Sequence, residues 1–138
     1  MFGLHGRPPL RVQSGDDSFL LRGFIDRIDR DAEGKLRVID YKTAGPWGFG
    51  KQAVRDGKKL QLPLYALAAQ DALRLGTVTE GFYWHVQHAQ ASGFTLGNFE
   101  GGPGEAIEAA VGKAWEAVRG ARAGHFAPHP PADGCPSF

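Results

Sequence analysis

The sequence is poor in several features that define whole classes of proteins. A single cysteine, Cys135, excludes an intrachain disulfide. The formal net charge is only +1, so binding to nucleic acid would need a local basic patch. No apolar stretch approaches the length of a membrane span, and residues 1–10 hold Gly, His, Arg and two prolines where a signal peptide would be apolar. We therefore expect a soluble, cytoplasmic protein with no membrane partner.

The 138 residues, 42% hydrophobic and 22% charged, suit one globular domain with a modest core. We expect this domain to span residues 1–138. Residues 1–17 form an irregular start rich in Gly and Pro, within which residues 10–13 could form a short edge strand. Residues 125–138 form an extended, Pro-rich tail.

The most informative stretch reads as two β-strands joined by a polar turn. Residues 23–29 and 38–43 are rich in β-branched and aromatic side chains. Between them, a three-residue loop ending at Gly34 would place this glycine where φ is positive, a conformation that glycine adopts cheaply. The pattern predicts a β-hairpin.

The register of this hairpin would place two carboxylates opposite each other. If Asp31 pairs with Lys35, Asp26 lies opposite Asp40, and Lys42 shares their face. Like charges in these positions destabilise a sheet, and acids on a mostly apolar face are costly unless they are paired or bind an ion. A divalent cation, which prefers carboxylate oxygens, would resolve the conflict. The alternative is a structural ion pair of Lys42 with one acid, the other acid lying at the solvent edge.

Both faces of the hairpin are largely apolar. The alternation puts Phe24, Ile28 and Val38 on the face of the acids, and Ile25, Ile39 and Tyr41 on the other. Both faces must then be covered, which predicts an α/β fold in which a mixed central sheet is flanked by helices. Arg27 faces away from the acids in this register, so we expect it to have a structural role.

The chain after the hairpin alternates helical and extended patterns. Residues 60–75 have helical periodicity, and Pro63 suits a first turn that starts near Gln61 or Leu62, which puts Gln61 and Tyr65 on one helix face. Other segments predict an aromatic strand, a short return strand and an amphipathic helix: residues 78–88, 94–96 and 105–123. His85 and His88 would lie on opposite strand faces, so we expect them to be structural or exposed rather than joint metal ligands.

A loop and a basic stretch lie between the hairpin and the first helix. Trp47 and Phe49, in a Gly- and Pro-rich loop, could stack on a nucleic-acid base or could cover the edge of the core. The basic residues that follow could contact phosphates or could simply be solvated: Lys51, Arg55, Lys58 and Lys59.

Three blocks of the sequence, taken together, resemble the PD-(D/E)XK nuclease superfamily. They are Gly-Phe-Ile-Asp-Arg-Ile-Asp at 23–29, Val-Ile-Asp-Tyr-Lys-Thr at 38–43 and Gln-Leu-Pro-Leu-Tyr-Ala at 61–66. The order and spacing are most similar to the RecB/AddB-type exonuclease domain, which CRISPR-associated exonucleases also resemble. The resemblance implies a restriction-endonuclease-like core and a metal-dependent DNA exonuclease of repair or recombination, with DNA and a helicase or another repair subunit as partners.

The resemblance also implies roles for particular residues. Asp26 and Asp40 would bind Mg²⁺ or Mn²⁺, with the backbone carbonyl of Tyr41 as a further ligand. Lys42 would orient or deprotonate the attacking water and contact the phosphate. Gln61 would position Lys42 or the water. Tyr65 would be a further catalytic residue and would position the phosphate.

Two features depart from the family pattern. Relatives have an upstream helix that supplies a His or Glu metal ligand, whereas here only a short segment precedes the hairpin, and we interpret its His5 as a surface residue. Relatives also have cysteines for an iron–sulfur cluster after the last helix, but Cys135 alone cannot hold one, so a cluster would need a longer parent protein and the purified chain should contain no stoichiometric iron. These departures suggest an excised fragment or a minimal homologue.

The departures leave two rival interpretations open. One is a catalytically incompetent nuclease fold that serves DNA binding or assembly. The other is a small structural protein whose acids are merely paired.

Overall fold

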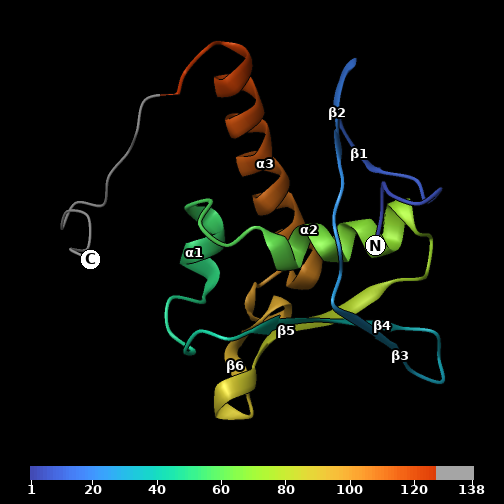
Figure 1. Cartoon of the computed structure of the whole chain (residues 1–138), viewed down its shortest axis with the longest axis vertical. Helices are drawn as coiled ribbons and strands as arrows, with labels where there is room; N and C mark the ends of the chain where they lie inside the picture. Colours follow the sequence, from blue (N-terminus) through green and yellow to red (C-terminus); the bar gives the residue numbers. More distant parts are fainter. Residues whose placement is uncertain (127–138) are drawn as a thin grey trace.

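The structure is a computed structural model that describes residues 1–126, and its centre is a mixed four-stranded sheet (Figure 1). The strand order is β3–β4–β5–β6, with β4 and β5 parallel and the other pairs antiparallel. The strands are β3 (Arg27–Arg30), β4 (Leu36–Lys42), β5 (Val78–His85) and β6 (Gln90–Thr95). The predicted α/β class is therefore confirmed. Cys135 and nearly all of the predicted tail lie outside the described residues.

Helices pack on one face of this sheet. In Figure 1, α2 (Gln61–Leu67) and α3 (Gly102–Arg122) lie on the same side of it. The shorter elements include α1 (Lys51–Arg55) and a π-helical turn over Ala68–Ala72, which continues α2. Two 3₁₀ turns span Val86–His88 and Leu96–Asn98. The predicted helices over 60–75 and 105–123 are confirmed, whereas α1 lies in the basic stretch, for which the sequence predicts no helix.

The N-terminal segment is more regular than expected. It forms a separate antiparallel ribbon of β1 (Leu10–Ser14) and β2 (Asp17–Leu21). The predicted edge strand over 10–13 is thus confirmed, and β2 is an addition to it. His5, as expected, is an exposed residue of a turn.

One core joins the elements that carry the candidate site. Val38 of β4, Leu62 of α2 and Ala106 of α3 are fully buried in the same apolar cluster. Burial of a side chain such as Val or Leu contributes about 1.5–3 kcal/mol. A second cluster, built around Phe2 and Trp115, ties the β1–β2 ribbon to the helices. The relative positions of β4 and α2 are therefore fixed by well-packed side chains.

The hairpin has the predicted register. Arg27 pairs with Ile39 and Arg30 with Leu36, and the Asp31 N–H donates to the Lys35 carbonyl at 3.0 Å. Gly34 has φ of 82°, in the left-handed region that the turn requires.

The predicted faces of Phe24 and Ile25 are wrong. Phe24 is 58% exposed, while Ile25 packs against both core clusters. The reason is that β3 begins only at Arg27: Gly23 pairs with Phe2 in an isolated bridge, and the chain bends before entering the sheet. Alternation of faces holds only along a regular strand.

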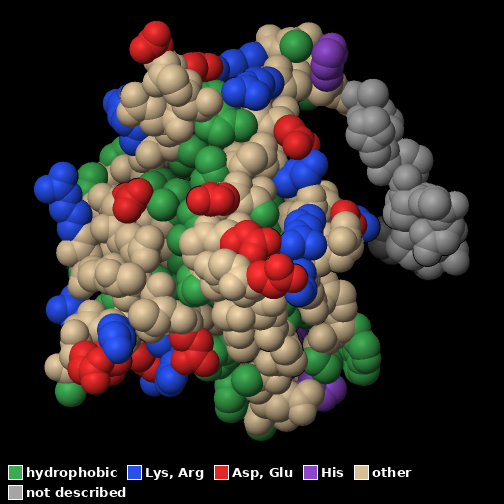
Figure 2. All heavy atoms as spheres, turned by 180° about the vertical axis from the view of Figure 1, so that it is seen from behind, with side chains coloured by type: hydrophobic (Ala, Val, Ile, Leu, Met, Phe, Trp, Pro, Cys, Tyr) green, Lys and Arg blue, Asp and Glu red, His purple; other side chains and the backbone are tan. Residues whose placement is uncertain are grey.

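The second face of the sheet is also more open than predicted. Within residues 1–126 no α-helix covers it, and Tyr41 is 41% exposed there. Arg37 and Glu80 pair across this face at 2.6 Å. The charged side chains in Figure 2 are mixed in sign, in keeping with the net charge of +1, so a nucleic-acid site must be local. No helix of residues 1–126 has the length and apolar character needed to cross a bilayer.

Glu105 accepts a backbone hydrogen bond at the N-terminus of α3, and we expect its charge to stabilise the protein. Its Oε2 accepts a hydrogen bond from the Gly101 N–H at 2.8 Å, and Oε1 accepts one from Arg55 at 3.0 Å. The Gly101 N–H and then Arg55 lower the pKa of Glu105, so the stabilisation is present above the ordinary carboxyl range and is lost as the pH falls through the folded-state pKa.

Glu105→Gln should therefore lower Tm at pH 7, and its difference from the unmodified protein should shrink as the pH falls below the ordinary carboxyl range and the carboxyl protonates. Thermal melts followed by circular dichroism across this pH range test the effect. Glu108→Gln, at an exposed position of the same helix, is the control. A difference that stays constant down to pH 3 would show that the charge of Glu105 is not the cause.

Candidate active site

The side chains of Asp26 and Asp40 lie close to each other, although only Asp40 belongs to a regular strand. Asp40 projects from β4 and is only 3% exposed, whereas Asp26 lies at the bend before β3. Asp26 Oδ2 accepts a hydrogen bond from the Tyr41 N–H at 2.9 Å. Asp26 is thus tethered to the backbone next to Asp40, at the point where the β3–β4 ladder has ended.

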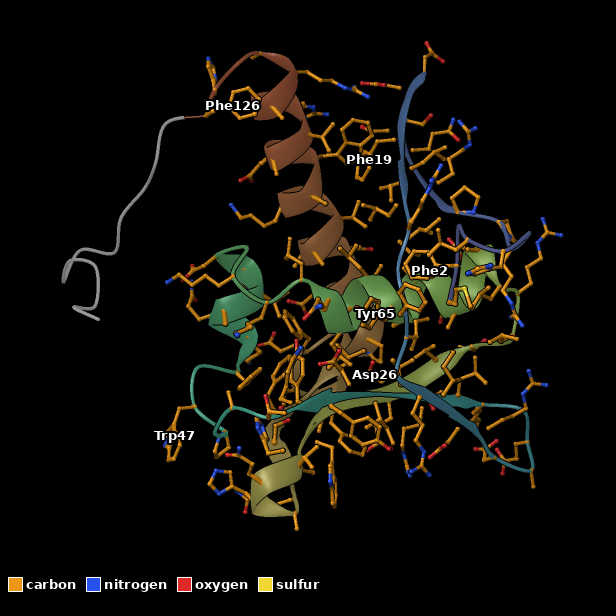
Figure 3. All side chains as sticks on the ribbon, viewed as in Figure 1. Phe2, Phe19, Asp26, Trp47, Tyr65 and Phe126 are labelled. Atoms are coloured by element: carbon orange, nitrogen blue, oxygen red, sulfur yellow. The ribbon has the colours of Figure 1, made fainter. Side chains whose placement is uncertain are left out.

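Lys42 connects these acids to α2. Its Nζ lies 2.6 Å from Asp40 Oδ2 and donates to Gln61 Oε1 at 2.8 Å. The Gln61 amide in turn donates to the Tyr65 hydroxyl at 3.4 Å, across one turn of the helix. The structure therefore brings all five predicted catalytic side chains into one constellation (Figure 3 labels Asp26 and Tyr65).

The local electrostatics reflect a desolvated acid near a second acid. Burial raises the pKa of Asp40; the Lys42 ammonium opposes this shift, and the charge of Asp26 adds to it. Burial also raises the pKa of Tyr65, and the negative charge of Asp40 raises it further. Excess negative charge at Asp26 and Asp40 is what a bound cation would neutralise.

The donor atoms fit a hard divalent cation. Asp40 Oδ2 is buried, and the Lys42 ammonium lies 2.6 Å from it. Together with Asp26 and the Tyr41 carbonyl, Asp40 offers only oxygen ligands, which such ions prefer. The described chain gathers no cluster of three His, Cys, Asp or Glu side chains, so water and substrate would supply the remaining ligands.

Two neighbours of the site were missed from the sequence. The parallel register of β4 and β5 sets Tyr83 beside Asp40 and His85 beside Lys42. The Lys42 ammonium lies 5.6 Å from the centre of the Tyr83 ring, and His85 Nδ1 lies 2.9 Å from the Ala44 carbonyl, to which it must donate. His85 is fully buried and His88 exposed, which agrees with the expectation that these histidines are structural or exposed.

The two loop aromatics have different surroundings. Phe49 packs on Tyr83 and His85, with the Lys59 ammonium 4.6 Å from its ring centre, so for Phe49 the core interpretation is confirmed. Trp47 is 77% exposed and points away from the body of the protein (Figure 3), so it does not cover the core. Base stacking by Trp47 stays a prediction.

Arg27 lies away from this constellation. It pairs with Asp29 at 2.7 Å and donates to the Tyr41 hydroxyl at 3.4 Å, both on the open side of the sheet.

A sheet hairpin that holds two acids and a lysine, completed by a Gln and a Tyr from a packed helix, defines a class of nucleases. The sequence profile of the PD-(D/E)XK nuclease superfamily matches residues 2–137, and the chain belongs to this superfamily.

More specific relatives are ATP-dependent helicase/deoxyribonuclease subunits B. The subunit of Moorella thermoacetica is 46% identical over 76 residues, which make up 51% of this chain and 6% of the relative. That of Streptococcus mutans is 33% identical over 95 residues, 61% of this chain and 9% of the relative. That of Staphylococcus haemolyticus is 34% identical over 90 residues, which make up 58% of this chain and 8% of the relative. The chain thus spans less than a tenth of each of these relatives, and no solved structure matches it.

Proposed function

We propose that the chain is a metal-dependent DNA exonuclease domain that hydrolyses phosphodiester bonds. The observation that carries the proposal is the placement of Lys42, whose ammonium contacts buried Asp40 on one side and Gln61 on the other. An ion pair this close to a tethered second acid is poorly explained as a stabilising device, because buried charges rarely repay their desolvation. A catalytic site explains why the fold retains them.

Asp26 and Asp40, with the Tyr41 carbonyl, would hold Mg²⁺ or Mn²⁺. When bound, such an ion lowers the pKa of a water and stabilises charge on the scissile phosphate. The remaining side chains would act on the reacting groups directly. Lys42, ion-paired and therefore a hydrogen-bond donor, would orient the water and contact a phosphate oxygen.

The helix residues would hold this arrangement in register. Gln61 accepts from Lys42 and would keep its ammonium aimed at the water. Tyr65, whose hydroxyl lies next in the chain of contacts, would donate to a phosphate oxygen. The raised pKa of Tyr65 keeps its hydroxyl protonated and able to donate.

The relatives named above suggest the biological setting. They are helicase/deoxyribonuclease subunits, so we propose DNA as the substrate and a helicase or another recombination or repair subunit as the partner. The rival remains a nuclease fold that binds DNA or assembles with a partner without cleaving, since the chain covers so small a part of those proteins.

A cleavage assay separates these two functions. End-labelled linear DNA and covalently closed circular DNA are incubated with the protein in Mg²⁺, in Mn²⁺ and in EDTA. Metal-dependent release of label from linear DNA alone supports an exonuclease. Binding of linear DNA without loss of label in either metal supports the rival.

A further inference from the structure

A groove opens beside the candidate site and shares two of its residues. Gln61 and Tyr65 line it, together with the apolar side chain of Leu64, and its volume is about 390 Å³. This lies within the range of small-ligand pockets, roughly 300–1,000 Å³. None of the roles proposed above uses this space.

The inner wall of the groove is aromatic and closely packed. The Phe2 and Tyr65 rings meet edge to face, with centres 6.4 Å apart (Figure 3). Gly23 passes against both: a Cβ there would lie 3.1 Å from the Phe2 ring and 3.7 Å from that of Tyr65. Two backbone hydrogen bonds between Phe2 and Gly23, of 2.9 and 3.1 Å, hold this wall in place.

Positive charge comes to the groove from two separate segments. Arg22 follows β2, and Lys58 lies in the loop between α1 and α2. Both side chains are exposed; Arg22 forms no ion pair within residues 1–126, and Lys58 lies 3.4 Å from Asp56. Among residues 1–126, no acidic side chain lines the groove, although the protein as a whole is nearly neutral. The lining is complementary to an anion with an apolar part.

A short chain of contacts joins the groove to the candidate metal ligands. Gln61, which lines the groove, accepts a hydrogen bond from Lys42 at 2.8 Å, and the Lys42 ammonium lies 2.6 Å from Asp40. A nucleotide in the groove would therefore be a neighbour of the phosphate that reacts at the candidate site.

We propose that this groove is a subsite for one unpaired nucleotide of a single DNA strand, adjoining the phosphate at Asp26 and Asp40. The proposal rests on the proposed nuclease function. The base and sugar lie against the apolar lining, and Arg22 and Lys58 contact the neighbouring phosphates. A base reaches such a groove only when it has left a duplex stack, so the groove selects single-stranded DNA.

The test is binding of a fluorescein-labelled dT12 oligonucleotide, followed by anisotropy in EDTA over a series of salt concentrations. Each phosphate contact to a single strand contributes about −0.7 to the slope of log K against log salt. Arg22→Ala and Lys58→Ala should each weaken binding several-fold and reduce the magnitude of the slope by about 0.7. Arg22→Lys, which keeps the positive charge, should retain most of the affinity and of the slope.

Arg7→Ala is the matched control. It removes the same charge from a different hollow of about 460 Å³, which Arg7, Arg11 and Arg74 line away from the candidate site. It should leave binding unchanged. An equal loss with Arg7→Ala, an unchanged slope with Arg22→Ala, or no binding of dT12 by the unmodified protein overturns the proposal.

A duplex competitor tests strand selectivity. A blunt dT12·dA12 duplex should bind more weakly than dT12, and its binding should not respond to Arg22→Ala. Equal sensitivity of the duplex to Arg22→Ala overturns the proposed selectivity.

These measurements also separate this proposal from the proposed function. Binding of dT12 that depends on Arg22, without any cleavage in Mg²⁺ or Mn²⁺, leaves the subsite standing and rejects the nuclease. Cleavage whose KM is the same in the unmodified protein and Arg22→Ala rejects the subsite alone.

Discussion

Replacement of Lys42 by alanine should reduce DNA cleavage by about 10²-fold or more, the contribution expected of a positioned donor that stabilises developing charge. The ammonium of Lys42 is held between Asp40 and Gln61, so it is placed for a water and a phosphate rather than free to move. Its removal leaves both carboxylates in place. The fold and any stabilisation by Mn²⁺ should therefore survive. Single-turnover cleavage of end-labelled DNA measures the chemical step. Thermal melts with and without Mn²⁺ measure the stability of the fold and its increase on metal binding.

Lys35→Ala is the control for this substitution. It removes a lysine from the far end of the same hairpin, where Lys35 pairs with exposed Glu33. An unchanged cleavage rate after Lys42→Ala would mean that the constellation is not an active site, and the binding-module interpretation would replace the nuclease.

Asp40→Asn should abolish stabilisation of the fold by divalent cations. In the unmodified protein, an ion that binds the native state alone stabilises it by about 2.7 kcal/mol at 100 times its Kd. Millimolar Mn²⁺ or Mg²⁺ should thus raise Tm. Asp40 is the buried member of the pair, and the amide retains its shape but removes the charge that attracts the ion. Thermal melts at increasing concentrations of each metal give the comparison.

Asp29→Asn provides the matched control, since Asp29 belongs to the same hairpin but pairs with Arg27 on the open side of the sheet. It should show the same rise in Tm as the unmodified protein. A full rise in Asp40→Asn would mean that the ion binds elsewhere.

The sequence predicts well what is decided locally. The turn at Gly34 sets the hairpin register, so the pairing of residues 27–30 with residues 36–39 follows from a few adjacent residues. Gln61 and Tyr65 share a helix face for the same reason: their spacing is a property of one helix.

Features that depend on distant pairing were not predictable in this way. Phe24 is exposed because Gly23 is bridged to Phe2, more than twenty positions earlier in the chain. Tyr83 and His85 join the site because β5 pairs in parallel with β4, and such pairing leaves no signal in the spacing of either strand. The groove likewise combines residues from three separate segments.

The short turn of the hairpin has a consequence for how this part of the chain can vary in length. Extra residues at the tip, between Asp31 and Lys35, would enlarge the loop and leave the strand pairing untouched. Loss of one of the three loop residues would leave a two-residue loop, which is a common hairpin connection when a glycine remains in it. Among functional variants, this turn should therefore differ in length more readily than the two strands that it joins.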